Sequence, residues 1–209
     1  QLMRARVSNQ LATSPEEAMN KFRGELAGTP RSAAAANYGL VLALTAAGKA
    51  NEARLALDGI WSRDPERIEY IIADARIDMA RRQPEKAVAK LEARLKLAPG
   101  NFPLTMAYAD ALMADGKPHV AEPVLVAQSK LNPNDPGLWY LLAEIQGLSG
   151  NIVGLHQSRA EYFILNGNLD QAEKQLSYAL KLTRGDFLNS AKITQRLADI
   201  AQMRAQMDS

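Results

Sequence analysis

The 209-residue sequence contains no cysteine, few aromatic residues and no long apolar run. The lack of cysteine excludes a disulfide framework and a thiolate nucleophile or metal ligand, and it is compatible with a reducing or an oxidising compartment. No stretch reaches the roughly 18 apolar residues that a membrane-spanning helix needs, so we expect no direct membrane span. Neither positive nor negative charge predominates. The formal net charge is +2 and the charged residues are interspersed, which argues against nucleic acid as a partner.

The opening residues, QLMRARVSNQ, have no methionine at position 1 and no apolar core of a signal peptide. We therefore expect the chain to be part of a longer precursor from which targeting information has been removed. Composition alone leaves the compartment open.

What the sequence does contain is self-similarity at a spacing of 34 residues. Small residues and prolines recur at that spacing, at Pro65, Pro99 and Pro133; at Ala53, Ala87 and Ala121; and at Gly48, Gly116 and Gly150. In the glycine series, position 82 is occupied by Arg82. Three series in phase indicate stacked helical repeats. Alanine lets paired helices approach closely, a leucine four residues later fills the adjoining space, and glycine and proline mark the helix ends.

This pattern resembles that of tetratricopeptide repeats, in which W-x2-L-G is followed by A-x3-F and then proline. Trp139, Leu142 and Ala143 supply the first element, with alanine in place of glycine. The second element, with leucine in place of the aromatic residue, is supplied by Ala53-x3-Leu57, Ala87-x3-Leu91, Ala121-x3-Leu125 and Ala172-x3-Leu176. The resemblance implies an all-α fold, a superhelical solenoid of about ten to eleven helices with a C-terminal capping helix.

Helix starts are marked by Ser, Thr or Asp before proline, and helix ends by glycine. These signals predict helices over residues 15–27, 31–47, 50–63, 66–81, 85–97, 102–115, 118–131, 136–149, 152–166, 168–183 and 187–207. We expect a single domain, 1–209, made of an N-terminal junction and leading helix (1–30), the repeats (31–184) and a capping helix (185–209). Because Gly150 and Gly167 are only 17 residues apart, the helix over 152–166 is expected to close one repeat and open the next.

Residue types that carry chemistry are sparse. His119 and His156 are 37 residues apart with no glutamate at metalloprotease spacing, and there is no nucleophile elbow, phosphate-binding loop or dinucleotide fingerprint. We therefore predict no catalytic residue and no metal site in this chain. Asp74 and Asp78 lie one helical turn apart, and because unpaired buried charge is costly we expect one of them to pair with Arg94.

Two further expectations concern packing. Trp61, Trp139 and Phe187 are expected in the core. Pro123 falls inside a predicted helix and is expected to kink that helix or end it early.

The first helices of stacked pairs line a concave surface in such solenoids, and that surface is where they usually bind partners. Projection of these helices predicts a partner-binding face made of Tyr38, Leu42, Glu69, Ile72, Arg76, Met79, Met106, Asp110, Met113, Tyr140, Glu144, Gln157 and Glu161. Flexible methionines and amphipathic tyrosines suit a tolerant binder of polypeptide segments. Packing between helices explains the methionine stripe equally well, so both interpretations stay open. The face lacks the cations of tetratricopeptide domains that clamp a chain-terminal carboxylate.

The residues from Glu161 onward resemble a more specific family. The matching segments are Glu161-Tyr162-Phe163, Gly167-Asn168, Asp170-Gln171-Ala172, Gln175-Leu176, Ala179-Leu180-Lys181-Leu182 and Arg184-Gly185-Asp186-Phe187. They are similar to the C-terminal repeat domain of periplasmic zinc metalloproteases of the HExxH type. The opening QLMRARV also resembles the junction after the protease domain of that family. The close match covers about a fifth of the chain.

The resemblance implies a non-catalytic docking and substrate-presenting platform in the Gram-negative periplasm, within a protease that supports quality control of outer-membrane protein assembly. The implied partners are the outer-membrane barrel-assembly machinery, its client β-barrel proteins and the chain's own protease domain. No cofactor is implied for this fragment, because zinc is expected only in a protease domain that these residues do not include. The alternative is a free-standing tetratricopeptide adaptor or assembly factor of another bacterial envelope pathway.

Overall fold

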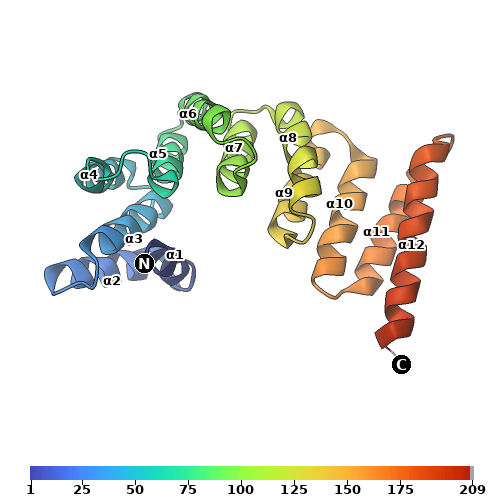
Figure 1. The fold of residues 1–209 in the computed structure, drawn as a ribbon, viewed down its shortest axis with the longest axis horizontal. Coiled ribbons are helices and arrows are strands. Elements are labelled where there is room, and N and C mark those ends of the chain that lie inside the picture. Colours follow the sequence, from blue (N-terminus) through green and yellow to red (C-terminus); the bar gives the residue numbers. More distant parts are fainter. Residues whose placement is uncertain (208–209) are drawn as a thin grey trace. The chain divides into compact units, whose positions relative to one another are not determined.

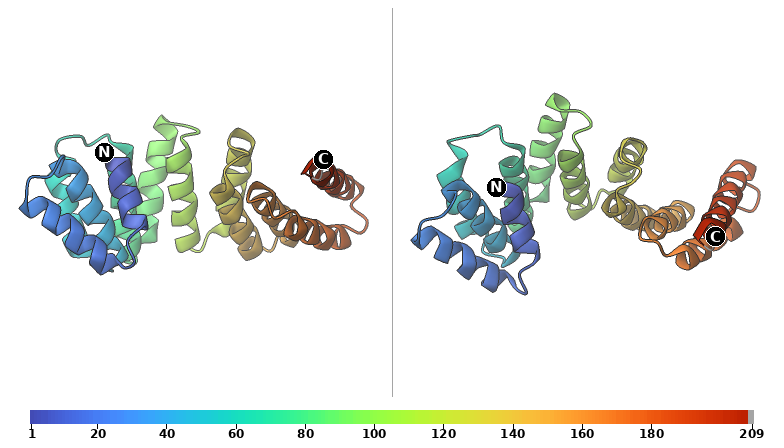
Figure 2. Two further views of the ribbon diagram at one scale, coloured as in Figure 1. Left: turned by 90° about the horizontal axis from the view of Figure 1, so that it is seen from below. Right: turned by 60° about the horizontal axis from the view of Figure 1, so that its bottom comes forward.

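The computed structural model describes residues 1–207, and the regular structure of this part is entirely α-helical (Figures 1 and 2). The helices are α1 (Leu2–Gln10), α2 (Pro15–Ala27), α3 (Ala33–Ala46), α4 (Ala50–Trp61), α5 (Ile68–Ala80), α6 (Pro84–Leu97), α7 (Phe102–Ala114), α8 (Pro118–Leu131), α9 (Pro136–Ser149), α10 (Ile152–Leu165), α11 (Leu169–Leu182) and α12 (Phe187–Met207). All the predicted helices are present, and their ends agree with prediction to within about two residues. No helix in the described residues combines the length and apolar character needed to cross a membrane.

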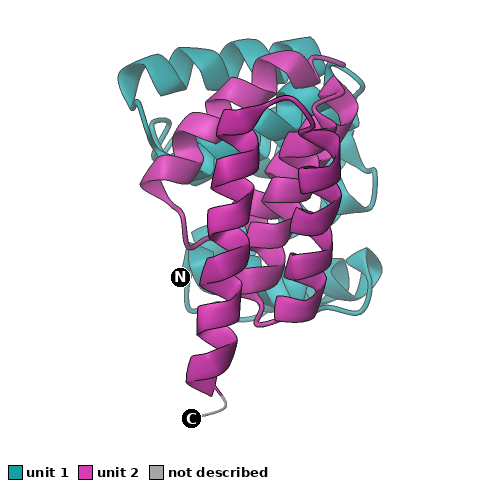
Figure 3. Ribbon diagram, turned by 90° about the vertical axis from the view of Figure 1, so that its right-hand side faces the viewer, with its two compact units in different colours: residues 1–115 teal, residues 116–209 magenta. Residues whose placement is uncertain are grey.

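The chain forms two compact units (Figure 3). Unit 1, residues 1–115, contains α1 to α7, and unit 2, from residue 116, contains α8 to α12. Within unit 1 each helix from α2 to α6 packs against the next, and α1 packs mainly against α3. Within unit 2 each helix likewise packs against its successor, and α10 contacts both α9 and α11. The single-domain division expected from the sequence stays a prediction.

The residues on the 34-residue spacing form the inner contacts of the helix pairs. Ala53, Ala87 and Ala121 have no exposed surface, and neither do the leucines four residues after each of them. Ala172 and Leu176 are buried in the same way. Each alanine lets its helix approach the neighbour, and each leucine fills the space beside it. The all-α repeat architecture predicted from this spacing is confirmed.

The helix ends follow the same spacing. Gly48, Gly116 and Gly150 all have positive φ, between 69° and 82°, a conformation that glycine adopts without a steric penalty. Arg82, in the missing glycine place, also has a positive φ of 60°. After Arg82 the backbone N–H of Gln83 donates to the Asp78 carbonyl, as the N–H of Asn151 does to Gln146 after Gly150. The turn geometry is therefore kept although the residue type is unfavourable.

Helix α1 is an element that the sequence patterns did not predict. It is mostly polar and buries only Leu2 and Ala5. Its position is fixed by α3, where the Asn9 side-chain amide donates to the Gly39 carbonyl at 2.7 Å. Because α1 is short and buries only Leu2 and Ala5, it depends on tertiary contacts such as this one.

Two packing expectations need correction, those for Phe187 and Trp139. Phe187 is 88% exposed, because it begins α12 and points away from the core, while Ile193 and Ile200 are buried against the unit 2 core. Trp139 is only half-buried, and its indole N–H donates to the Pro133 carbonyl at 2.7 Å. Pro123 does not end its helix early, since α8 continues to Leu131, and the kink expected there stays a prediction. Trp61 is half-buried and packs against the unit 1 core.

Candidate protein-binding surfaces

In unit 1 the predicted partner-binding residues differ in accessibility. Tyr38 is 4% exposed and Ile72 is buried, so neither offers much surface to a partner. The Tyr38 ring lies 6.0 Å from that of Tyr70, and burial raises the pKa of the Tyr38 hydroxyl. Glu69 on α5 is exposed. The three predicted residues on α7, Met106, Asp110 and Met113, are all partly buried.

The remaining unit 1 residues line an open cleft. Leu42 of α3 and Arg76 and Met79 of α5 meet Arg6 and Asn9 of α1 around a volume of about 400 Å³. Helix α1 therefore supplies one wall of this surface. Sequence reasoning missed that wall because residues 2–10 carry no repeat signal.

In unit 2 two of the four predicted residues lie on α9 and two on α10. Tyr140 is 53% exposed, and a hydrogen bond to the Glu144 carboxylate raises the pKa of its hydroxyl. Gln157 is partly buried. Glu161 is engaged within the unit, because Arg196 of α12 donates to both of its carboxylate oxygens, at 2.8 and 2.6 Å. This bidentate pair raises the pKa of Arg196 and ties the capping helix to α10.

A small pocket of about 170 Å³ lies beside Tyr140. Helix α9 contributes Tyr140, Ala143 and Glu144 to its lining, α10 contributes three further residues and α11 contributes Gln175. The α10 residues, which sequence projection missed, are Arg159, Tyr162 and Phe163. They were missed because α10 belongs to two repeats, so a projection based on one repeat selects only one of its faces. The adjacent aromatic residues in Glu161-Tyr162-Phe163 are the signal that could have found them.

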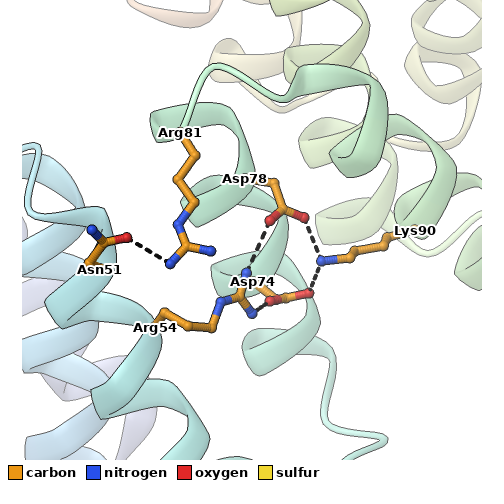
Figure 4. Close-up of polar contacts among 6 residues, drawn as sticks. All are labelled: Asn51, Arg54, Asp74, Asp78, Arg81 and Lys90. Carbon is orange, nitrogen blue, oxygen red and sulfur yellow. Dashed lines mark hydrogen bonds and ion pairs between the residues drawn. The ribbon is translucent and has the colours of Figure 1, made fainter.

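The two neighbouring aspartates of α5 lie in a buried ion-pair network, and the expected pairing with Arg94 is wrong (Figure 4). Arg54 of α4 pairs with Asp74 and, at 3.0 Å, with Asp78. Lys90 of α6 pairs with Asp74 at 2.5 Å and also with Asp78. Two cations thus neutralise two carboxylates, which gives the aspartates a structural explanation.

Arg94 pairs with Glu66 at 2.6 Å. Helices α5 and α6 run in opposite directions, so Arg94, late in α6, faces the segment just before α5 begins. Lys90, one turn earlier in α6, reaches the second half of α5, where Asp74 and Asp78 lie. The sequence analysis thus identified the buried aspartates but predicted Arg94 as their partner in place of Lys90, one turn earlier.

The histidines have ordinary surroundings. His119 is exposed. The Nδ1 of His156 lies 2.7 Å from the Gln175 side-chain oxygen, and its ring lies 5.5 Å from that of Tyr178. A glutamine and a tyrosine therefore occupy the surroundings of His156.

Comparison with known proteins agrees with this architecture. Residues 78–146 match the family described as Tetratricopeptide repeat. The chain folds as tetratricopeptide repeats. Tetratricopeptide structures resemble it over nearly its whole length: a thermophilic repeat protein of Thermus thermophilus has a TM-score of 0.57 at 19% identity, covering 97% of this chain and 100% of that one. A MamA chain of Desulfovibrio magneticus RS-1 has a TM-score of 0.53 at 17% identity, covering 84% and 97%.

Curated relatives are similar at a higher level of identity. The chain is 29% identical over 177 residues to the Beta-barrel assembly-enhancing protease of Escherichia coli (strain K12). The aligned residues cover 85% of this chain and 36% of that protein. The protein of the same name from Yersinia pestis is 28% identical over 176 residues, covering 84% and 36%. The chain therefore spans little more than a third of the length of the curated relatives it matches.

Proposed function

We propose that this chain is the protein-binding domain of a periplasmic metalloprotease, where it docks partners and presents substrates during quality control of outer-membrane protein assembly. The observation that carries the proposal is the 29% identity to the Beta-barrel assembly-enhancing protease over 85% of this chain. Its partners are the barrel-assembly machinery, client β-barrel proteins and the protease domain of the same protein. The chain contributes binding, and the chemistry belongs elsewhere in the protein.

The zinc chemistry of such a protease does not fit the residues described. Within residues 1–207 no group of three His, Asp or Glu side chains lies close enough together to hold a metal ion. Asp74 and Asp78, the two aspartates one helical turn apart on α5, are already neutralised by Arg54 and Lys90. A zinc site would therefore be built by other residues of the full-length protein.

The surface chemistry of both units supports polypeptide binding. In unit 1, Met79 borders an open cleft together with an arginine from α1 and another from α5. In unit 2, Tyr140 presents an exposed ring beside a pocket with aromatic walls. Thioethers adapt to differently shaped side chains, and tyrosine offers contact area with a polar tip, so both surfaces suit varied protein segments.

Affinity capture from an envelope extract tests the proposal. The variant with Met106, Met113 and Tyr140 all changed to Ala should capture less barrel-assembly machinery and fewer client barrels, with unchanged far-UV circular dichroism. A matched control changes three exposed leucines of α4, α6 and α8, namely Leu55, Leu97 and Leu131, to Ala. Equal capture by the wild type and the Met106, Met113 and Tyr140 variant would contradict the predicted face. Capture of a different envelope assembly would favour the free-standing adaptor.

A further inference from the structure

Three of the seven residues that line the small pocket beside Tyr140 are aromatic. The rings of Tyr140 and Tyr162 lie 5.6 Å apart in an edge-to-face arrangement, and those of Tyr162 and Phe163 lie 5.4 Å apart in the same manner. Ala143 also lines the pocket; it is buried and contributes only a methyl group, which leaves the space open. Two helices packed along their length, α9 and α10, supply these groups, so the walls are fixed by the repeat architecture.

The size of the pocket restricts what it can hold. Its volume is about 170 Å³, and an apolar cavity of about 150 Å³ is known to accept a benzene ring. One large side chain therefore fills it, whereas a helix or a drug-sized molecule does not fit. Edge-to-face contacts favour an aromatic occupant over an aliphatic one of the same area by roughly threefold to tenfold.

Charges of opposite sign lie on the two sides of the pocket. Glu144 stands on the α9 side, where its carboxylate raises the pKa of the Tyr140 hydroxyl. Arg159 stands on the α10 side, is exposed, and has no ion-pair partner within residues 1–207. Because like charges across an interface repel, a ligand with acids on both sides or bases on both sides of its anchor is disfavoured.

We propose that this pocket receives one aromatic side chain from within a client polypeptide, flanked by a basic residue that faces Glu144 and an acidic residue that faces Arg159. The inference rests on the proposed function, because it assigns the kind of segment that the protein-binding surface recognises. The aromatic ring supplies most of the affinity and the two flanking charges select the segment.

Short fluorescein-labelled peptides with one central phenylalanine test the inference by fluorescence anisotropy on the 209-residue chain. The flanking residues are one Lys and one Glu, two Lys, two Glu, or two Ser, and a further peptide replaces the phenylalanine of the mixed-charge peptide with alanine. The mixed-charge peptide should bind tightest, about threefold tighter than the Ser peptide. Replacing its phenylalanine should weaken binding roughly tenfold.

Three variants define the site. Tyr140→Ala removes an exposed wall and should weaken every phenylalanine peptide by roughly tenfold. Tyr178→Ala, an equally exposed tyrosine on α11 outside the pocket lining, should leave binding unchanged. Arg159→Glu makes both sides acidic, so the peptide with two Lys should become the tightest ligand. This exchange of ranking does not depend on the direction in which the peptide lies.

Several results would overturn the inference. They are equal binding of the phenylalanine and alanine peptides, an equal effect of Tyr178→Ala and Tyr140→Ala, and an unchanged ranking in Arg159→Glu. A further peptide ends in phenylalanine with a free carboxylate. If it bound more tightly than the mixed-charge peptide, the pocket would recognise a chain terminus and not an internal segment. If no peptide binds but the Met106, Met113 and Tyr140 variant still loses its partners, the pocket inference fails and the proposed function stands. If client capture is also unchanged, both fail.

Discussion

The Phe22 ring of α2 lies so close to Gly39 of α3 that a β-carbon on residue 39 would be 2.4 Å from the ring. Phe22 is itself buried, at 2% exposure, so its ring has little room to move aside. The Gly39 carbonyl also accepts the hydrogen bond from Asn9 that holds α1. Residue 39 thus contacts two helices, and its lack of a side chain is what allows the close approach of α2.

The change Gly39→Ala is expected to destabilise unit 1 by about 1–2 kcal/mol, because overpacking a core costs more than alanine gains in helix propensity. Urea unfolding followed by circular dichroism measures it. Gly24→Ala is the matched control, since Gly24 lies in α2 and a β-carbon added there would have nothing within 4 Å. The control should gain about 0.5–1 kcal/mol. If Gly39→Ala were as stable as Gly24→Ala, the close contact would not matter energetically.

Replacing Arg82 with glycine should stabilise the chain by about 0.5–1 kcal/mol. Arg82 has a φ of 60°, a conformation that costs a residue other than glycine roughly 1–2 kcal/mol. Glycine avoids this cost, but its greater freedom in the unfolded state offsets part of the gain. The reciprocal change, Gly48→Ala at a φ of 73°, should destabilise. Thermal unfolding of both variants measures whether Arg82→Gly raises the stability and Gly48→Ala lowers it. A loss of stability in Arg82→Gly would show that the arginine side chain stabilises the fold by more than its backbone conformation costs.

Removal of the Lys90 ammonium is expected to cost about 2 kcal/mol, because Asp74 and Asp78 would then share Arg54 alone in a largely buried site. Lys90→Met keeps most of the side-chain volume and isolates the effect of the charge. Arg94→Ala loses a pair with a mostly exposed Glu66 and should cost less than about 1 kcal/mol. Denaturant midpoints compare the two variants, and a larger effect from Arg94→Ala would restore the pairing first expected from the sequence.

The fold could be predicted from the sequence because local signals and repeat spacing agree. Ala53 and Ala87 bury the same contact in successive helix pairs, so a spacing visible in the sequence is also a spacing in space. The ion-pair partners could not be predicted as well, because Lys90 and Arg94 are one turn apart and only the registration of α5 against α6 separates them. For the same reason Tyr162 and Phe163 were missed: which face of α10 is open depends on the packing of α9 and α11.

The start of the capping helix gives a prediction about pH. The Asp186 carboxylate accepts hydrogen bonds from the backbone N–H of Asn189 at 3.1 Å and from its side-chain amide at 2.6 Å. These bonds favour the charged form and lower the pKa of Asp186 below its ordinary value of 3.8. The contribution of this carboxylate to stability is therefore complete above the unfolded-state pKa and is lost as the pH falls through the lower folded-state pKa.

A ¹⁵N NMR titration of the Asn189 backbone amide should detect this protonation as a shift with a midpoint below 3.8. The Asp186→Asn variant keeps an oxygen acceptor but cannot ionise, so its Asn189 amide should show no such transition. Asp186→Ala lacks the acceptor at every pH, so hydrogen exchange of the first backbone amides of α12 should be faster in this variant at neutral pH. A midpoint at or above the ordinary value, or the same transition in Asp186→Asn, would mean that the carboxylate does not cap α12.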